Sequence, residues 1–463
     1  MIKESQKWVE RNQGLHVENK GDYTSPRISS ELPDCSMPLT FDHYSFCSLG
    51  CLYCFAYFFK SNNSIIKDSP LKAVNPNRVL NSINGVVKNP RDKALYEHFY
   101  RNKFLLHWGG LADPFCNFES TNKVGYRLMK GLGELNYPTL FSFKGDAIFR
   151  KKYEKLFSKY AHQKNFAFQI SIITADKHLS KYVEMGVPSP KRRIEAIRML
   201  SDMGYWTILR LRPYIIGITD KHIVELLEKS YQAGISGVSM EFFAMDSRAN
   251  KGMKTRYDWL AKLIKVEDLQ KYYAALSPSE RGGYMRLNRL IKEPYVKQVY
   301  KFCIENNLTF GCSDPDFKEL NTSGSCCAMP DKFPSNPDLQ NWTRSQLTFY
   351  LKQARKRYHK TGKRMKFYFN KVYSTNAEYL DDLRFTRDHI STINKCEVEI
   401  KNITLRQILQ TQWNNLNSPS NPRNYFHGKI MPIELDEEGN LVFIYQPSEY
   451  EERWKKEGLK LTV

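Results

Sequence analysis

Three cysteines lie close together near the start of the chain, in a pattern that could bind a metal cluster. Cys47, Cys51 and Cys54 follow the spacing C-x3-C-x2-C. Iron–sulfur clusters are normally held by cysteine thiolates, usually four of them. Three thiolates on one short loop can hold three irons of a [4Fe–4S] cube and leave the fourth iron without a protein ligand. We therefore expect a cluster whose fourth iron is open to a substrate or a cofactor.

Two other interpretations of the cysteine loop remain open at this point. Zinc commonly uses a second arm of ligands beside a C-x2-C pair, and His43 is the nearest additional ligand. The thiols could also be free. No further metal-binding arm accompanies the loop in the spacing that zinc sites usually have, so the iron–sulfur cluster is the favoured interpretation.

The charge of the chain indicates the kind of partner it meets. The 463 residues carry a formal net charge of +21, with 41% hydrophobic and 13% aromatic residues. A chain of this composition can bury a sizeable core, and a field of this sign favours polyanions such as nucleic acid or an anionic membrane surface. A compositional bias toward lysine, without any function, is the alternative explanation.

The sequence predicts no membrane span and no secretory signal. No stretch approaches 18 apolar residues, and Met1 to Gly14 is polar. We therefore expect a cytoplasmic protein, and in a reducing compartment clustered cysteines are metal ligands more often than disulfides.

Short apolar runs alternate with helical patterns over most of the chain, which predicts βαβ units and a parallel sheet. Strands are expected at 37–44, 104–108, 138–143, 166–172, 206–212, 236–242 and 308–311, and helices at 77–103, 122–135, 151–160, 190–203, 220–232 and 290–305. Polar residues 244–280 are read as an insertion. No G-x-G-x-x-G follows the first strand, which argues against a dinucleotide-binding sheet. The fold class expected is α/β, a partial (β/α)6–7 barrel with a basic α+β extension at the C-terminus.

Three segments are expected along the chain. Residues 1–36 form a polar arm, residues 37–330 the barrel, and residues 331–463 a basic, aromatic-rich extension. Within the extension we expect a helix at 404–413 and a hairpin of 430–435 with 441–445. The run Phe367 to Phe369, with Val372, is read as strand.

The residues that follow the predicted strands give the chain a resemblance to the radical S-adenosylmethionine (SAM) enzymes. The resemblance rests on the cysteine loop, with Tyr53 just before its third cysteine, and on three further segments in order: 109–115, 143–144, and 169–172 with Glu184 and Pro188. Among the branches of that superfamily, the spore photoproduct lyase-like group is the most similar.

The resemblance implies the cofactors and the residues that bind them. In the family, SAM chelates the open iron through its amino and carboxylate groups, and one electron from the cluster cleaves it to a radical that abstracts hydrogen from a substrate. Gly109 and Gly110 match the turn that bonds the methionyl amine, and glycine lets a backbone approach a ligand closely. Lys144 and Ser171 match contacts to the SAM carboxylate or ribose. By the same resemblance the Tyr53 backbone lies near the adenine, and Asp113 belongs to the cofactor-binding set.

The chain lacks one cysteine that the family pattern would place after the second strand. In the photoproduct lyases a hydrogen-donating cysteine lies in the segment after the second strand, whereas the matching stretch here, residues 107–110, has none. Cys116 lies further on, and a radical relay through its thiol is weighed against a small buried apolar side chain. Repair of thymine photoproducts is not predicted.

A second set of cysteines follows the last predicted strand. Cys312, Cys326 and Cys327 could hold an auxiliary iron–sulfur cluster, with Asp314 or a substrate as the fourth ligand. A zinc site and uncoordinated thiols are the alternatives.

The C-terminal extension contains a run of basic residues with aromatic residues between them, which is typical of nucleic-acid binding. Lysine and arginine neutralise phosphates, and aromatic rings stack on unpaired bases. A solvated helical face is the alternative. The predicted contacts are Arg344, Lys352, Arg355, Lys356, Arg357, Lys360, Lys363 and Arg364.

The sequence thus predicts an enzyme that cleaves SAM and abstracts hydrogen from a nucleic acid or a nucleobase-containing molecule. The expected partners are SAM, an electron donor such as flavodoxin or ferredoxin, and DNA or RNA. A peptide or small metabolite as substrate is one alternative. The other is a nucleic-acid-binding protein whose cluster is structural or senses redox state.

Overall fold

A computed structural model describes most of the chain, in two compact units. The described residues are 15–17, 19–20, 26–29, 34–35, 37–56, 71–85, 99–248, 251–277, 280–281, 283–329, 347–373, 381, 384–385 and 403–461. The first unit consists of Met1–Pro26, Phe41–Leu80 and His107–Val299, and the second of Arg27–Thr40, Asn81–Leu106 and Tyr300–Val463. The predicted division into three segments stays a prediction.

A sheet whose consecutive strands lie side by side forms the centre of the first unit. Six of the strands of this sheet follow the order β9-β8-β7-β6-β5-β3, and the pairs β6/β7, β7/β8 and β8/β9 are parallel. The bounds are β3 (Leu39–Phe41), β5 (Leu106–Trp108), β6 (Thr139–Phe143), β7 (Phe166–Ser171), β8 (Trp206–Tyr214) and β9 (Gly237–Phe242). This is the arrangement of a partial (β/α) barrel, and the predicted α/β fold class is confirmed.

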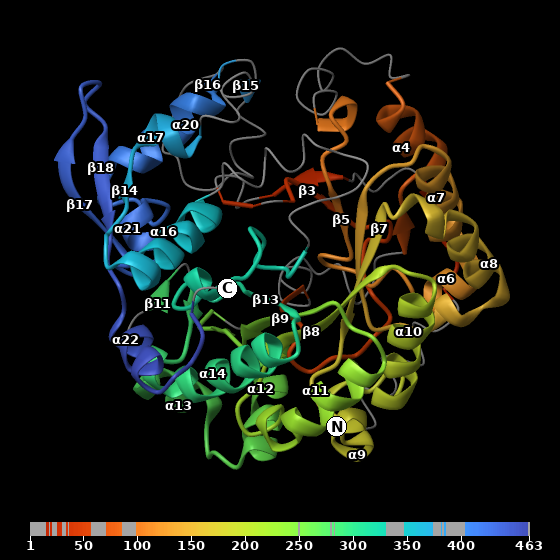
Figure 1. Cartoon of the computed structure of the whole chain (residues 1–463). Coiled ribbons are helices and arrows are strands. Elements are labelled where there is room, and N and C mark those ends of the chain that lie inside the picture. Colours follow the sequence, from red (N-terminus) through yellow and green to blue (C-terminus); the bar gives the residue numbers. More distant parts are fainter. Residues whose placement is uncertain are drawn as a thin grey trace. The chain divides into compact units, whose positions relative to one another are not determined.

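Helices follow the strands, as expected for βαβ units. They are α7 (Val124–Glu134), α8 (Lys151–Tyr160), α10 (Pro190–Asp202) and α11 (Ile223–Gln232), and Figure 1 shows α7, α8 and α10 on one side of β5 and β7. The start of α10 follows from its sequence: the Ser189 side chain accepts a hydrogen bond from the Arg192 amide at 3.3 Å, with proline in the first turn. Gly204, with a φ of +84°, follows its end.

Two helices lie in the segment that the sequence analysis treated as a polar insertion. They are α12 (Lys251–Ile264) and α13 (Leu269–Leu276), beside a small antiparallel sheet of β10 (Met245–Asp246), β12 (Tyr284–Met285) and β11 (Glu280–Arg281). In α12 the buried residues Met253, Tyr257, Leu260 and Ala261 recur at helical spacing. Charged residues between them obscured this stripe in the sequence.

Two other predictions were wrong at their edges. Helix α4 (Pro76–Ile83) ends well before residue 103, where the predicted helix ended, and residues 86–98 lie outside the described part of the chain. The predicted helix 122–135 corresponds to α7, but it begins two residues later: Asn122 ends the preceding helix α6 (Asn117–Asn122), and Lys123 between them adopts a left-handed conformation with a φ of +56°.

The second unit contains the last predicted strand and the C-terminal extension. Its elements include β13 (Thr309–Cys312), α16 (Leu347–Thr361) and α20 (Leu405–Asn414). The predicted hairpin is confirmed as β17 (Ile430–Leu435) and β18 (Leu441–Tyr445), with β14 (Lys366–Phe367) paired to β18. The strand expected through Phe369 was wrong, because the backbone turns into the short helix α17 (Phe369–Val372).

A network of buried charged groups lies inside the second unit. Glu451 accepts hydrogen bonds from the side chains of Ser448, Tyr445 and His359, at 2.6, 2.7 and 2.8 Å. Lys429 Nζ lies 3.2 Å from Glu319 Oε1. Burial nevertheless outweighs that contact and raises the pKa of Glu319 to about 8.

Among the helices that the structure describes, none is both long enough and apolar enough to cross a bilayer.

Candidate functional site

A cavity of about 320 Å³ in the first unit is lined by the cysteine loop and by residues that follow β5, β6 and β7. All nine residues that the sequence assigned to a cluster and a cofactor line it. These are Cys47, Cys51, Tyr53, Cys54, Gly109, Gly110, Asp113, Lys144 and Ser171. The carboxyl ends of parallel strands meet at one edge of a sheet, which is why segments so far apart in sequence meet here.

The cysteine loop is held in place by backbone contacts to distant segments. The Leu52 amide donates to the Val183 carbonyl at 2.9 Å, and Cys51 forms an isolated bridge with Glu184. From α12, Arg256 donates to the Cys51 carbonyl at 2.6 Å. The loop is therefore fixed on two sides without using its thiols.

Two of the thiols, Cys47 and Cys51, lie in a setting that disfavours their charged form. A hydrogen bond with Cys116, together with burial, raises the pKa of the Cys47 thiol well above its ordinary value. Burial likewise raises the pKa of Cys51, although the nearby Lys144 opposes the shift. Thiolates at these positions need a cation beside them, and the irons of a cluster would supply it.

The fit of these residues to a cluster rests on the shared cavity and on the thiol chemistry. Within the described residues, no group of three or more His, Cys, Asp or Glu side chains is already arranged to hold a single metal ion. Three thiols that face one cavity from one loop match the donor set of a cluster with an open iron.

Gly109 and Gly110 form the turn after β5, and only the first requires glycine for the fold. Gly109 has a φ of +103°, and a Cβ there would lie 2.1 Å from the Ser142 carbonyl oxygen. At Gly110 the nearest atom to an added Cβ is Asp42 Oδ2, at 3.9 Å. The turn is fixed by Asp42 Oδ1, which accepts from the amides of Leu111 and Ala112 at 2.8 Å each. A methyl group at Gly110 would therefore enter the cavity rather than the protein.

Asp113 connects the turn to the end of β6. Its Oδ1 accepts from the Phe115 amide at 2.8 Å, and its Oδ2 accepts from the amides of Lys144 and Gly145 at 2.5 and 3.1 Å. Burial raises the pKa of Asp113, and these amides oppose the shift. The carboxylate braces the backbone that presents Lys144, whose ammonium lies 5.6 Å from the centre of the Tyr53 ring.

Ser171, at the end of β7, presents a buried hydroxyl to the cavity. Its side-chain oxygen has no hydrogen-bond partner among the described residues, and the residue is fully buried. A buried hydroxyl without a partner is costly unless a ligand or water completes it. This oxygen is the clearest single sign that the cavity holds a polar molecule.

A buried ion pair joins Ser171 to the cysteine loop. Arg193 donates to the Ser171 carbonyl and to Glu184 Oε2, both at 2.6 Å. Glu184 also accepts a short hydrogen bond from the Tyr53 hydroxyl. The pair is fully enclosed, so losing either partner would leave an uncompensated buried charge.

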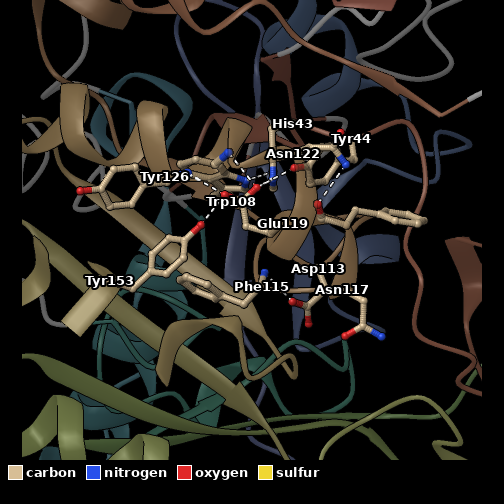
Figure 2. A network of polar contacts seen from close by, with 12 residues as sticks. His43, Tyr44, Trp108, Asp113, Phe115, Asn117, Glu119, Asn122, Tyr126 and Tyr153 are labelled. Atoms are coloured by element: carbon tan, nitrogen blue, oxygen red, sulfur yellow. Dashed lines mark hydrogen bonds and ion pairs between the residues drawn. The ribbon is translucent and has the colours of Figure 1, made fainter. Parts of the chain in front are cut away.

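Glu119, in α6, is the centre of a second buried network, shown in Figure 2. It accepts from Tyr44 at 2.6 Å, from the Gly125 and Tyr126 amides at 2.9 Å each, and from Tyr153. The fifth partner is His43, whose Nε2 lies 3.3 Å from Glu119 Oε2. Burial raises the pKa of a carboxyl, but here the bonds from His43, Tyr153 and Tyr44 outweigh it and lower the pKa of Glu119.

This network removes His43 as a zinc ligand. The Trp108 indole donates to His43 Nδ1 at 3.0 Å, so Nδ1 is an acceptor and the hydrogen of the neutral ring is on Nε2, facing Glu119. Both ring nitrogens are therefore engaged, and the zinc alternative based on His43 is not supported by the structure.

Cys116 lies at the start of α6, behind the cysteine loop. It is fully buried and is not among the described residues that line the cavity. Its side chain forms a hydrogen bond with that of Cys47, and this bond helps to raise the pKa of Cys47. A radical relay through Cys116 stays a prediction.

The second cysteine set lies in the second unit. Cys312 is fully buried, Cys327 is 3% exposed and Cys326 is half-buried. The Cys312 amide donates to Asn321 Oδ1 at 2.6 Å, and the Cys327 amide donates to the Ser325 hydroxyl at 3.2 Å. An auxiliary cluster at these three thiols stays a prediction.

The predicted nucleic-acid contacts divide into two groups. Lys352 and Arg355 are buried on the inner face of α16, and Arg355 donates to the Tyr300 hydroxyl at 3.2 Å. Buried side chains do not reach phosphates, so these two are corrected to core positions. Arg357, Lys360, Lys363 and Arg364 are exposed, Lys356 is half-buried, and Arg344 lies outside the described residues.

Sequence reasoning missed several residues that line the cavity, namely Arg210, Arg212, Glu241, Tyr284 and Arg286. A signal for the first two was present: Arg-Leu-Arg on a central parallel strand, where a near-continuous apolar run is expected.

No protein-family model and no curated protein matches this chain. Twenty-four solved chains match it in structure. A spore photoproduct lyase variant with bound AdoMet and dinucleoside spore photoproduct has a TM-score of 0.47 and 14% identity, covering 65% of this chain and 82% of that chain. Streptococcus suis SuiB bound to S-adenosylmethionine has a TM-score of 0.37 and 15% identity, covering 60% and 51%. These matches are likenesses to other proteins, and no function is taken from them.

Proposed function

We propose that this chain is a radical SAM enzyme. Cys47, Cys51 and Cys54 would bind a [4Fe–4S] cluster, and SAM would occupy the adjoining cavity. The observation that carries the proposal is the meeting of all nine predicted residues around one cavity. The motif supplies the type of cluster, and the cavity supplies the space beside it.

The residues around the cavity would bind and orient SAM. When bound, a reduced cluster supplies the electron that cleaves the SAM sulfonium to a 5′-deoxyadenosyl radical, which abstracts a hydrogen atom from the substrate. The backbone at Gly109 and Gly110 would face the methionyl group, Lys144 would offer a positive charge to its carboxylate, and the Ser171 hydroxyl would bond a polar atom of SAM. The buried Glu184–Arg193 pair holds the Tyr53 side chain and the Ser171 backbone in place, through hydrogen bonds from the Tyr53 hydroxyl and to the Ser171 carbonyl.

The proposal is tested by the products of SAM. Anaerobically reconstituted protein with dithionite should convert SAM to methionine and 5′-deoxyadenosine. Replacement of Cys47, Cys51 and Cys54 together by alanine should abolish this reaction and the bound iron. Cys303→Ala, at a buried cysteine of the second unit, is the control and should retain both. Wild-type protein that carries iron but forms no 5′-deoxyadenosine would refute the proposal.

For the substrate, we propose a nucleic acid or a nucleobase-containing molecule. The exposed residues Arg357, Lys360, Lys363 and Arg364 support it, because clustered surface cations bind phosphates. DNA or RNA should then accelerate release of 5′-deoxyadenosine, with flavodoxin or ferredoxin as electron donor in a cytoplasmic setting. If only a peptide or a small metabolite accelerates the release, that class of molecule is the substrate and the nucleic-acid proposal is wrong. Nucleic-acid binding without any SAM cleavage would favour a structural or redox-sensing cluster.

We also propose an auxiliary cluster at Cys312, Cys326 and Cys327. Chemical analysis of iron should then give about eight irons per chain in the wild type, since each [4Fe–4S] cluster contributes four. Replacing these three cysteines by alanine should remove half of them. Equal iron content in both proteins excludes the auxiliary cluster.

A further inference from the structure

Part of the cavity lining is not used by the predicted SAM residues. It consists of Arg210 and Arg212 on β8, Glu241 on β9, and Tyr284 and Arg286 from the small sheet of the insertion. Three of these five side chains are guanidinium groups. They require an explanation that SAM binding by the other residues does not provide.

The geometry of β8 turns two of these guanidinium groups into the same space. Side chains alternate along a strand, and Leu209 and Leu211 are fully buried on the opposite face. Arg210 lies directly beside Ser171 of β7 in the parallel register. The two arginines therefore extend the row of polar residues that begins with the SAM-facing hydroxyl.

Tyr284 and Arg286 are two residues apart at β12, and both reach the same cavity. The Arg286 guanidinium carbon lies 5.8 Å from the centre of the Tyr284 ring. Within the described residues, no carboxylate forms an ion pair with Arg286. This corner of the cavity thus offers an aromatic face beside a positive charge.

The charges around the cavity do not balance. The described lining carries four cationic side chains, from Lys144, Arg210, Arg212 and Arg286, and two carboxylates, from Asp113 and Glu241. Both Asp113 oxygens already accept backbone amides. Glu241 lies 3.9 Å from Arg212. The surplus is positive.

The positive charges of Arg210 and Arg212 also act on a neighbouring histidine, His107. Burial, with the positive charges of Arg210 and Arg212, lowers the pKa of His107 to about 3. His107 therefore stays neutral at physiological pH and bonds the Ser142 side chain at 2.8 Å. The cavity's positive charge comes from its arginines and lysine.

We propose that Arg210, Arg212 and Arg286 form a phosphate subsite next to the SAM position, with Tyr284 as the stacking surface for the base of a nucleotide substrate. The guanidinium fork matches phosphate oxygens in two parallel hydrogen bonds, and an aromatic ring beside it stacks on a base. The inference rests on the proposed function for calling the nucleotide a substrate. The binding of the phosphate itself does not depend on SAM cleavage.

The test compares each of the four common 5′-mononucleotides with its nucleoside, by equilibrium dialysis against the reconstituted full chain. At least one mononucleotide should bind the wild type tenfold or more tightly than its nucleoside. Arg286→Met and Arg212→Met should each weaken that mononucleotide at least tenfold, which corresponds to about 1.4 kcal/mol. Binding of the nucleoside should change less than twofold.

Arg198→Met is the matched control, because Arg198 is exposed on α10 and does not line the cavity. It should leave all affinities unchanged. Arg212 is only 11% exposed, so the thermal unfolding of each variant is recorded, and the half-buried Arg286 carries the test if Arg212→Met fails to fold.

The SAM carboxylate is the competing source of negative charge, and the dissociation constant of SAM separates the two. The proposal predicts that SAM affinity stays within twofold in both variants. It is overturned if SAM binding falls while mononucleotide binding is retained. It is also overturned if no mononucleotide binds the wild type more tightly than its nucleoside.

Failure of this inference and failure of the proposed function give different results. Arginine-dependent nucleotide binding without 5′-deoxyadenosine formation would retain the subsite and remove the radical chemistry. Formation of 5′-deoxyadenosine, together with nucleotide binding that is unchanged in the arginine variants, would retain the radical chemistry and remove the subsite.

Discussion

Replacing Glu119 by glutamine should destabilise the first unit while changing only one oxygen to an amide nitrogen. Glu119 is fully buried and accepts five hydrogen bonds, two of them from backbone amides. Hydroxyl donors can rotate away from an introduced NH2 group, whereas the amides of Gly125 and Tyr126 cannot. Each orientation of the glutamine therefore sets its NH2 group against one fixed N–H donor.

The magnitude follows from these contacts. A buried donor left without an acceptor costs about 1–3 kcal/mol, and hydrogen bonds to a charged group are worth roughly 1 kcal/mol more than neutral ones. In the better orientation the introduced NH2 group takes the place of Oε1 and faces the Tyr126 amide. The bonds from Gly125, Tyr44 and His43 then go to a neutral oxygen and are weaker. We expect a loss of about 3 kcal/mol in the free energy of unfolding, after allowing for the lower desolvation of a neutral side chain.

Calorimetric melting measures this loss, expected as a fall of roughly 3–6 °C in Tm. Glu134→Gln is the control, since Glu134 forms an exposed pair with Lys130 at 3.7 Å and should shift Tm little. The lowered pKa of Glu119 stabilises the fold above the unfolded carboxyl value of 4.5 and ceases to do so as pH falls through the folded value. The gap between wild type and variant should shrink below pH 4.5. Equal melting of wild type and Glu119→Gln at pH 7 would refute the reasoning.

Three further predictions follow from the cavity, the buried acid and the basic surface. Gly110→Ala should fold normally and bind SAM at least tenfold more weakly, as measured by dialysis. Gly109→Ala should instead lower Tm, because its Cβ would lie 2.1 Å from the Ser142 carbonyl oxygen. Unchanged SAM affinity in Gly110→Ala would contradict the assignment of this turn to SAM binding. The folded chain holds a proton on Glu319 up to about pH 8, whereas the unfolded chain releases it near 4.5, so part of the stability is lost as pH rises between these values. Glu319→Gln should remove that part of the slope of Tm against pH, and a slope parallel to that of the wild type would count against it. Lys360→Gln with Lys363→Gln should lower the slope of log affinity for DNA or RNA against log salt by about 1.5–2, and an unaltered slope would exclude these residues from the interface.

The strands could be predicted because each depends on a short local pattern, whereas the nine cavity residues came from the cysteine spacing and from the resemblance to the radical SAM enzymes. Each apolar run is a few residues long, and the residue after it lies at the carboxyl edge of the sheet whatever the details of packing. Lys144, which directly follows one of the predicted strands, lines the cavity for this reason.

The residues that the sequence analysis missed depend on contacts between distant segments. The partners of Glu119 come from α7, α8 and the loop after β3, and nothing in the sequence around a single glutamate in a helix indicates them. Tyr284 and Arg286 reach the cavity because the insertion folds back as a small sheet. Arg355 was misassigned because charge alone does not distinguish the inner face of α16 from the outer one.

The most direct test of the account is whether SAM binds an iron of the cluster held by Cys47, Cys51 and Cys54. Reduced, reconstituted protein can be examined by electron–nuclear double resonance with SAM labelled by 15N at the amino group and by 17O at the carboxylate. The account predicts a changed cluster spectrum with hyperfine coupling to both labels, lost in Gly110→Ala at the same SAM concentration. A cluster spectrum that is identical with and without SAM, and free of coupling to either label, would contradict it.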